Sequence, residues 1–266
     1  MNHMLWPTAL CAVLLFWIGL KAEQKIASPV NRRLFVFAAT VLAAPGILFA
    51  AYYTKLLGEP IWLYEFRALP YTELTAAGVG LIAGFVHQAR NKHPFIKRQL
   101  RALTVPAILV VILAAPYAKP ILRPLDRTQL HENWKDGVCL QSTPSTCGPA
   151  SAATIIRSQG KKVTEAELAD ESLTYAGGTE NWYLVRALRQ RGFNPEFKRV
   201  APDAQQLPTP TVAGVKLPQG TGHFITLLSY DGTNYVASDP LTGRFTATLT
   251  ELKSDYRFTG FFLVVK

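Results

Sequence analysis

The residue of this chain best placed to act as a nucleophile is a cysteine that begins a predicted helix. Cys147 is followed by Gly148 and Pro149, which suit the first helical positions, and apolar residues at helical spacing continue to an expected end at Gly160. The partial positive charge of a helix N-terminus stabilises a thiolate, which is the attacking form of cysteine. We therefore predict that Cys147 is the nucleophile. The alternative is that it is a small buried hydrophobic residue.

A thiol nucleophile needs a general base, and two histidines follow the long apolar segments. His131 lies in a polar stretch, whereas His223 begins a run with strand character, so we predict that His223 is the base. A D-G-T-N turn and a second strand that ends at Asp239 come next. Strands joined by such a turn are antiparallel neighbours, so Asp239 is expected to lie near His223 and orient it. Both could instead be ordinary strand and turn residues.

Gln141 lies six residues before Cys147, one short loop ahead of the predicted helix. Its side-chain amide could donate a hydrogen bond to the oxyanion that forms on a carbonyl under attack, or it could simply brace the loop. With Gln141, the chain offers all four roles of a thiol acyl-transfer site: nucleophile, base, orienting carboxylate and oxyanion donor. The Cys and His residues lack zinc-ligand spacing, so we predict no metal and no cofactor.

The other two cysteines are interpreted as structural. Cys11 lies inside an apolar segment, and Cys139 is next to an apolar residue. A disulfide between Cys139 and Cys147 stays open, although two cysteines so close to a helix start do not readily reach disulfide geometry.

In this order and spacing, the four site residues resemble the C39 family of papain-like cysteine peptidases. The matching segments are Q-S-T-P-S-T-C-G-P-A-S-A-A, G-H-F-I-T-L-L, Y-V-A-S-D-P and F-F-L-V-V, within residues 130–266. The resemblance implies a papain-type peptidase that cuts a small precursor or leader peptide after Gly-Gly. Two features depart from the family: Thr146 stands where an acidic residue is common, and the sequence lacks the G-x-x-x-x-G-K-[ST] loop of the transporters to which familiar members are fused.

Two other classes of function fit the same residues. A non-catalytic peptide-binding module that assists export would use the same cleft, although such a module usually lacks the nucleophile. A thiol amidase or transpeptidase acting on cell-wall peptides would use the same chemistry. The expected partners are a peptide or precursor-protein substrate and the lipid bilayer, and a separate exporter is left open.

The site residues belong to a predicted α+β domain at residues 134–266, which follows a connector at 120–133. Three helices are expected first: the one from Cys147, one capped by Thr164 with Glu167, and one between Thr179 and Gly192. Strands are then expected at 195–200, 211–216, 223–230, 235–238, 244–249 and 260–265. Helices followed by antiparallel strands form an α+β arrangement. It agrees with the papain-like fold that the resemblance implies, in which helices pack on an antiparallel sheet.

Residues 1–119 are predicted to form an all-α transmembrane region of about four helices. Hydrophobic residues make up 49% of the chain and charged residues 17%, and the apolar excess is concentrated here. The predicted spans, which approach or reach the length needed to cross roughly 30 Å of hydrocarbon, are 4–20, 34–53, 74–89 and 102–118. The third is the weakest, because it is short and contains His87, and a G-x-x-x-G pattern at Gly80 and Gly84 suits close helix contact. The first is interpreted as an anchor, because a basic n-region and a cleavage site are missing.

Almost all of the net positive charge lies in the apolar N-terminal part of the chain. Of the net charge of +10, residues 1–123 carry +9, so the balance does not indicate a nucleic-acid-binding domain. Basic residues cluster at 21–33 and 90–101, and the positive-inside rule places both loops in the cytoplasm. The aromatic-rich loop between the second and third spans is then external. We therefore expect a multi-pass protein of a bacterial inner membrane with an extracytoplasmic peptidase domain.

Overall fold

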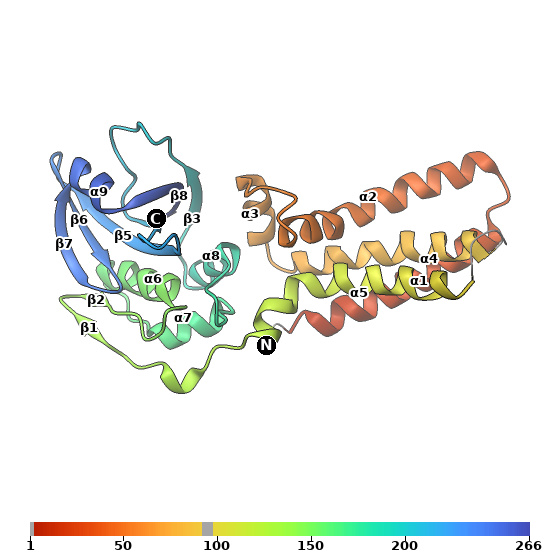
Figure 1. Cartoon of the computed structure of the whole chain (residues 1–266), viewed down its shortest axis with the longest axis horizontal. Helices are drawn as coiled ribbons and strands as arrows, with labels where there is room; N and C mark the ends of the chain where they lie inside the picture. The colour runs from red at the N-terminus through yellow and green to blue at the C-terminus, as the bar shows by residue number, and fades with distance from the viewer. Residues whose placement is uncertain (1–2, 92–97) are drawn as a thin grey trace. The chain divides into compact units, whose positions relative to one another are not determined.

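The computed structural model describes the backbone of residues 3–91 and 98–266, and side chains at residues 3–89 and 110–266. The chain divides into two compact units (Figure 1). The first comprises Met1–Glu59 and Leu69–Ile121, and the second comprises Pro60–Ala68 and Leu122–Lys266.

The first unit is helical, as predicted. Its elements are α1 (Leu5–Lys25), α2 (Pro29–Tyr53), the 3-10 helix η1 (Thr72–Gly78), α4 (Val79–Asn91) and α5 (Arg98–Leu122). Among the described residues, α1 and α2 are long and apolar enough to cross a membrane, and the bent pair Ile61–Ala68 and Thr72–Ala89 is a third candidate. Part of the predicted span 102–118 lies outside the described side chains, and Val110–Leu122 is a shorter apolar helix. Two or three apolar helices therefore indicate membrane anchoring.

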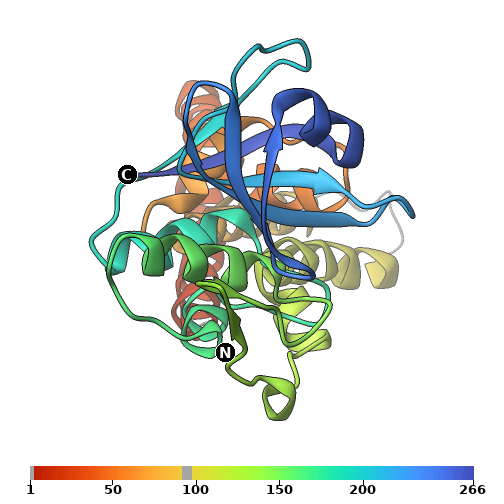
Figure 2. The same cartoon turned by 90° about the vertical axis from the view of Figure 1, so that its left-hand side faces the viewer.

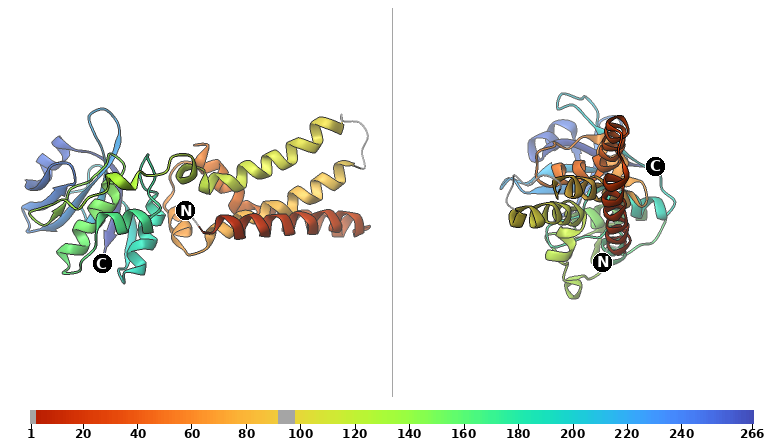
Figure 3. Two further views of the ribbon diagram at one scale, coloured as in Figure 1. Left: turned by 90° about the horizontal axis from the view of Figure 1, so that it is seen from below. Right: turned by 90° about the vertical axis from the view of Figure 1, so that its right-hand side faces the viewer.

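Close packing of α1 against α4 depends on the two glycines of the G-x-x-x-G pattern. The helices run side by side in both views (Figure 1 and Figure 3). A methyl group at Gly80 would collide with the carbonyl oxygen of Ala12, and one at Gly84 would collide with that of Phe16. Small residues at such positions let two helix backbones approach within van der Waals distance. The close helix contact suggested by the pattern is present.

The second unit contains a six-stranded antiparallel sheet. Its strands lie in the order β3-β8-β4-β5-β6-β7, and their bounds are β3 Pro195–Arg199, β4 Thr211–Lys216, β5 Gly222–Tyr230, β6 Asn234–Asp239, β7 Gly243–Thr248 and β8 Arg257–Val265. Each predicted strand is present, with ends that differ by up to three residues. A two-stranded hairpin of β1 (Trp134–Lys135) and β2 (Val138–Cys139) precedes the sheet and was not predicted.

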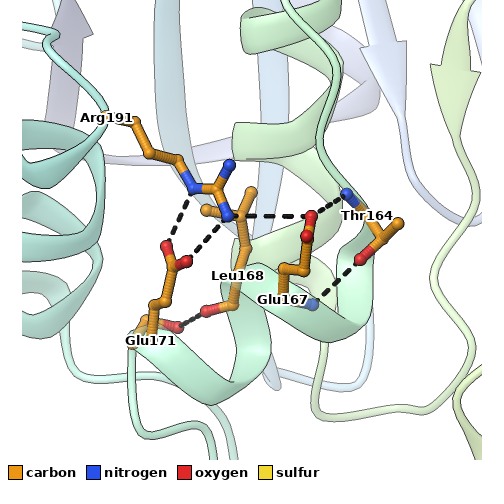
Figure 4. Close-up of polar contacts among 6 residues, drawn as sticks. Thr164, Glu167, Leu168, Glu171 and Arg191 are labelled. Atoms are coloured by element: carbon orange, nitrogen blue, oxygen red, sulfur yellow. Dashed lines mark hydrogen bonds and ion pairs between the residues drawn. The ribbon is translucent and has the colours of Figure 1, made fainter.

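Helices cover this sheet on two sides. The bundle of α6 (Cys147–Ser158), α7 (Glu165–Glu171) and α8 (Asn181–Gln190) lies on one side, and α9 (Leu249–Asp255) lies on the other (Figure 1 and Figure 2). The short helix η2 (Arg127–Gln129) lies in the connector. The predicted capping box at Thr164 is present, because its hydroxyl accepts from Glu167 N–H while the Glu167 carboxylate accepts from Thr164 N–H (Figure 4). The N-cap of α8 is Glu180. The unit is therefore the predicted α+β arrangement.

The main core of the sheet follows the alternation of its strands. Ile225 and Leu227 of β5 point into the same buried cluster as Val215 of β4 and Ala237 of β6. Leu252 of α9 is fully buried against them. A period of two along neighbouring strands thus builds one apolar layer, as a half-buried sheet requires.

The second unit also includes a short helix that lies between α2 and η1 in the sequence. In α3 (Ile61–Ala68), Tyr64 is only 1% exposed, and its ring lies 5.6–5.7 Å from those of Trp182, Phe197 and Phe261. Tyr64 belongs to the aromatic-rich loop predicted between the second and third spans, whose tyrosines and tryptophan suit the membrane interface. Its burial corrects that interpretation for Tyr64, because the aromatic side chains of α8 and the sheet enclose it.

The C-terminal end of α3 is held by two arginines of α8. Arg186 donates to the Arg67 carbonyl oxygen at 2.6 Å, and Arg189 donates to the Ala68 carbonyl oxygen at 3.1 Å. Carbonyl groups in the last turn of a helix have no partner within the helix, and arginine near that end also suits the helix dipole. These bonds fix α3 on the domain that contains the predicted site.

Candidate active site

Cys147 is the first residue of α6, at a helix end whose N–H groups are left uncapped by the preceding residue. The hydroxyl of the N-cap residue Thr146 accepts from Thr143 N–H at 3.1 Å and donates to the Thr143 carbonyl oxygen at 3.0 Å. Thr146 therefore makes no side-chain hydrogen bond to α6. The N–H groups of the first turn remain available to negative charge at Cys147, which is 8% exposed.

His223 and Asp239 form a buried pair on neighbouring strands. His223 lies near the start of β5 and Asp239 at the end of β6, and these strands pair in antiparallel register. His223 Nε2 lies 2.8 Å from Asp239 Oδ1, and the residues are 5% and 3% exposed. The hairpin thus brings a histidine and a carboxylate together.

The His223 imidazole also contacts the nucleophile candidate. Burial disfavours its charged form, but hydrogen bonds to Asp239 and Cys147, together with the charges of both partners, outweigh burial and raise the pKa of His223 to about 9. Since Nε2 faces Asp239, Nδ1 is the ring nitrogen left for Cys147. The contacts run from Cys147 to His223 and from His223 to Asp239, which is the arrangement of a nucleophile, a base and an orienting carboxylate.

Gln141 is anchored at both its backbone and its side chain. Its N–H donates to the Pro240 carbonyl oxygen at 2.9 Å, next to Asp239. Its Nε2 donates to the Thr143 carbonyl oxygen at 2.7 Å, in the turn that leads into α6. One Nε2 hydrogen makes this bond, which braces the loop, and the amide carries a second Nε2 hydrogen.

Tyr256 is a site residue that the sequence did not indicate. Its hydroxyl donates to Asp239 Oδ2 at 3.0 Å, and Leu241 N–H donates to Oδ1 at 2.8 Å. Burial raises the pKa of Asp239, but the hydrogen bonds from His223, Leu241 and Tyr256 lower it below its usual value. The carboxylate is therefore kept charged. Tyr256 follows α9, and no local pattern links it to Asp239.

Cys139 is separate from this group. Its N–H donates to Thr154 Oγ1 at 3.0 Å, and Thr154 lies about 10 Å beyond Cys147 along the axis of α6, at 1.5 Å per residue. Burial, followed by the charges of Glu165 and Glu132, raises the pKa of the Cys139 thiol to about 12. Cys139 and Cys147 are both free thiols. Cys139 is therefore a buried thiol in the core of the domain, and its raised pKa disfavours the reactive thiolate.

A cavity of about 540 Å³ lies between the loop after β4, β7 and the end of α9. Its lining includes Leu217, Pro218, Thr242, Phe245 and Tyr256, but not Cys147, His223 or Asp239. Tyr256, which contacts Asp239, is its link to the candidate site. Within the described residues, no group of three or more His, Cys, Asp or Glu side chains could hold a metal ion.

Comparison with known proteins matches the half of the chain that contains this site. A model of the peptidase C39 family matches residues 135–266. An uncharacterized protein of Methanothermobacter thermautotrophicus is 34% identical over 129 residues, which are 48% of this chain and 87% of that protein. The lactococcin-G-processing and transport ATP-binding protein LagD of Lactococcus lactis is 26% identical over 132 residues, 48% of this chain and 18% of LagD.

Two solved structures are each similar to about half of this chain. The peptidase domain of Streptococcus ComA, a bi-functional ABC transporter, is 21% identical with a TM-score of 0.41, covering 47% of this chain and 94% of that one. A double glycine motif protease from an AMS/PCAT transporter, in complex with the leader peptide, is 22% identical with a TM-score of 0.42, covering 48% and 89%.

Proposed function

Because this chain belongs to the peptidase C39 family through residues 135–266, we propose that it is a membrane-anchored cysteine peptidase. The observation that carries the proposal is the buried pair of His223 and Asp239, 2.8 Å apart, with Cys147 as the other partner of His223. We propose that the substrate is a small precursor or leader peptide. The name of LagD, a processing and transport protein, supports this class of substrate.

The first half of the proposed reaction forms a thioester. The Cys147 thiolate attacks the substrate carbonyl carbon, and the carbonyl electron pair moves onto oxygen to give a tetrahedral oxyanion. When the carbonyl reforms, the C–N bond breaks, and protonated His223 donates its proton to the departing amine. Asp239 keeps the imidazole oriented through Nε2, so that Nδ1 faces Cys147.

The second half releases the new carboxyl terminus. A water molecule attacks the thioester carbon while neutral His223 accepts a proton from it, and the C–S bond breaks to restore the Cys147 thiolate. The thiolate and the imidazolium are then ready for another cycle. In both halves, we propose that the second Nε2 hydrogen of Gln141 and the uncapped N–H groups at the start of α6 stabilise the oxyanion.

We propose that the cut follows Gly-Gly, as is characteristic of the family. The access to the nucleophile supports this specificity, because Cys147 is only 8% exposed. Thr179 and Phe224 lie beside the start of α6, 3.5–3.6 Å from the position of a Cβ at Gly148. We propose that access to the thiol is narrow enough for glycine to be preferred over residues with a side chain next to the scissile bond.

The test uses the full chain in detergent and three peptides that differ only before the scissile bond. A peptide with Gly-Gly should be cleaved at least about tenfold faster than its Ala-Ala and Leu-Gly counterparts, because the discrimination is steric. Cys147→Ala should abolish cleavage and labelling by a thiol-reactive probe, whereas the matched Cys139→Ala should keep most activity. Equal rates for the three peptides would exclude the Gly-Gly preference, and activity in Cys147→Ala would exclude the thiol mechanism.

A further inference from the structure

Glu165 is a buried carboxylate that the proposed chemistry does not use. It is the first residue of α7 and is 1% exposed. A buried carboxylate is costly unless hydrogen bonds compensate for its lost hydration. Here the donors come from Ser142: its N–H lies 2.9 Å from Oε1 and 3.2 Å from Oε2, and its hydroxyl contacts Oε2. Glu165 therefore holds both the backbone and the side chain of one residue.

Ser142 directly follows the proposed oxyanion donor. Holding Ser142 N–H fixes the peptide group that joins Gln141 to Ser142. On its other side, Gln141 N–H is bound by the Pro240 carbonyl oxygen at 2.9 Å. Gln141 is thus anchored at both flanking peptide groups, and Thr143 fixes its side-chain amide.

The connector contributes to the same anchor. His131 N–H donates to Ser142 Oγ at 3.1 Å, and the His131 carbonyl oxygen lies 2.9 Å from Oγ. Ser142 therefore links the connector, through His131, to α7, through Glu165. Glu165 contacts Ser142 through both of its carboxylate oxygens.

The helix that carries Glu165 is itself well fixed. Thr164 and Glu167 close the capping box around its first turn. Arg191, just after α8, reaches across to two carboxylates of α7, with Nη2 2.7 Å from Glu171 Oε1 and 3.6 Å from Glu167 Oε2 (Figure 4). These contacts determine where α7 begins, and hence where the Glu165 carboxylate lies.

We propose that Glu165 is a positioning residue for catalysis, which holds Gln141 in place for the oxyanion by binding Ser142. This inference rests on the proposed peptidase function. Loss of an oxyanion donor costs about 10² to 10³ in turnover, and displacement of a group by about 1 Å can cost about 10². Removal of Glu165 should therefore lower kcat while the peptide still binds.

A double-mutant cycle tests the route through Gln141. In the full chain, Glu165→Ala should lower kcat about 10- to 100-fold with less than about a threefold change in KM. In a Gln141→Ala background, the same change should lower kcat less than about threefold, because the group it positions is already gone. Equal losses in the two backgrounds would overturn the proposal.

Two further variants separate positioning from folding and charge. Glu165→Gln keeps an oxygen that accepts from Ser142 N–H, so it should recover most of the lost kcat, and failure to do so at an unchanged melting temperature would overturn the proposal. Glu196→Gln makes the same change at an exposed carboxylate of β3 that pairs with Lys198 and Lys266, so it should leave kcat unchanged. If Glu165→Ala does not fold, Ser142→Ala replaces it in the cycle; it removes the hydroxyl contact with Glu165 but keeps the N–H bonds, so a smaller loss with the same non-additivity is expected.

Failure of this inference is distinguishable from failure of the proposed function. If the wild-type chain does not cleave the Gly-Gly peptide, or if Cys147→Ala cleaves it equally well, the peptidase assignment itself is wrong. If cleavage requires Cys147 but the cycle is additive, only the role of Glu165 is wrong.

Discussion

Asp239 receives hydrogen bonds from three different segments. His223 Nε2 and Leu241 N–H lie 2.8 Å from Oδ1, and the Tyr256 hydroxyl lies 3.0 Å from Oδ2. The His223 bond orients the imidazole, and the other two keep the carboxylate charged and fixed. At the scale of single residues, the candidate site therefore includes Tyr256 as a support for Asp239.

The raised pKa of His223 predicts how activity depends on pH. Its pKa lies at about 9, above the ordinary value of 6.5, so the imidazolium is present below about pH 9 and is lost as the pH rises through it. Asp239→Asn removes a negative charge that favours the imidazolium. We expect kcat to fall and the alkaline limb of kcat/KM to move to lower pH, measured on the Gly-Gly peptide.

The same hairpin offers a matched control for this variant. Asp231 lies in the turn at its opposite end, where Oδ1 accepts from Thr233 and Asn234 N–H at 2.8 Å. Asp231→Asn makes the same change of charge away from His223, so it should leave the alkaline limb in place. An unshifted limb in Asp239→Asn would contradict the link between this carboxylate and the imidazolium.

Among the elements, α3 is unusual because it lies far in sequence from the unit it completes. It presents Tyr64 to an aromatic cluster, and Arg67 lies 4.3 Å from the centroid of the Trp182 ring. A guanidinium at this distance from an indole face makes a favourable cation–π contact. The domain that contains the site is therefore built from two separate segments of the chain.

Tyr64→Ala should destabilise the second unit by roughly 3–5 kcal/mol, the range for removal of a large aromatic side chain from a core. The free energy of unfolding is measured by urea titration of the full chain in detergent, followed by near-UV circular dichroism. Trp62→Ala is the control on the same helix, because Trp62 is 52% exposed and its loss should cost less than about 0.5 kcal/mol. Equal effects of the two variants would contradict the packing role of Tyr64.

At the scale of the whole molecule, the distribution of basic residues bears on the side of the membrane on which the site lies. We propose four spans with the peptidase domain outside the cytoplasm, because basic residues cluster at 21–33 and 90–101 and positive loops are retained in the cytoplasm. In this topology the thiol would cut its substrate after or during export.

Reporter fusions test this topology. A reporter active only outside the cytoplasm should be active when fused after Glu59 or Arg127 and inactive when fused after Arg33. The first two positions are expected to be external and the third to lie in a basic loop. The reverse pattern would place the peptidase in the cytoplasm, where it would act before export.

Much of the domain could be predicted because its signals are local. The helix from Cys147, the capping box at Thr164 and the strand that contains His223 are each encoded within about ten residues, by caps, turns and apolar spacing. The nearness of Asp239 to His223 followed from one tight turn. Such features depend on neighbours in the chain, so the sequence alone determines them.

Other features depend on how distant segments pack. The contacts of Tyr256 with Asp239, Glu165 with Ser142 and Tyr64 with Trp182 join residues that are 17, 23 and 118 positions apart. No periodicity or cap links these partners, because each contact exists only once the helices have closed on the sheet. The sequence by itself thus determined the helix that begins at Cys147 and the hairpin that joins His223 to Asp239, and the tertiary structure decided which side chains hold them in place.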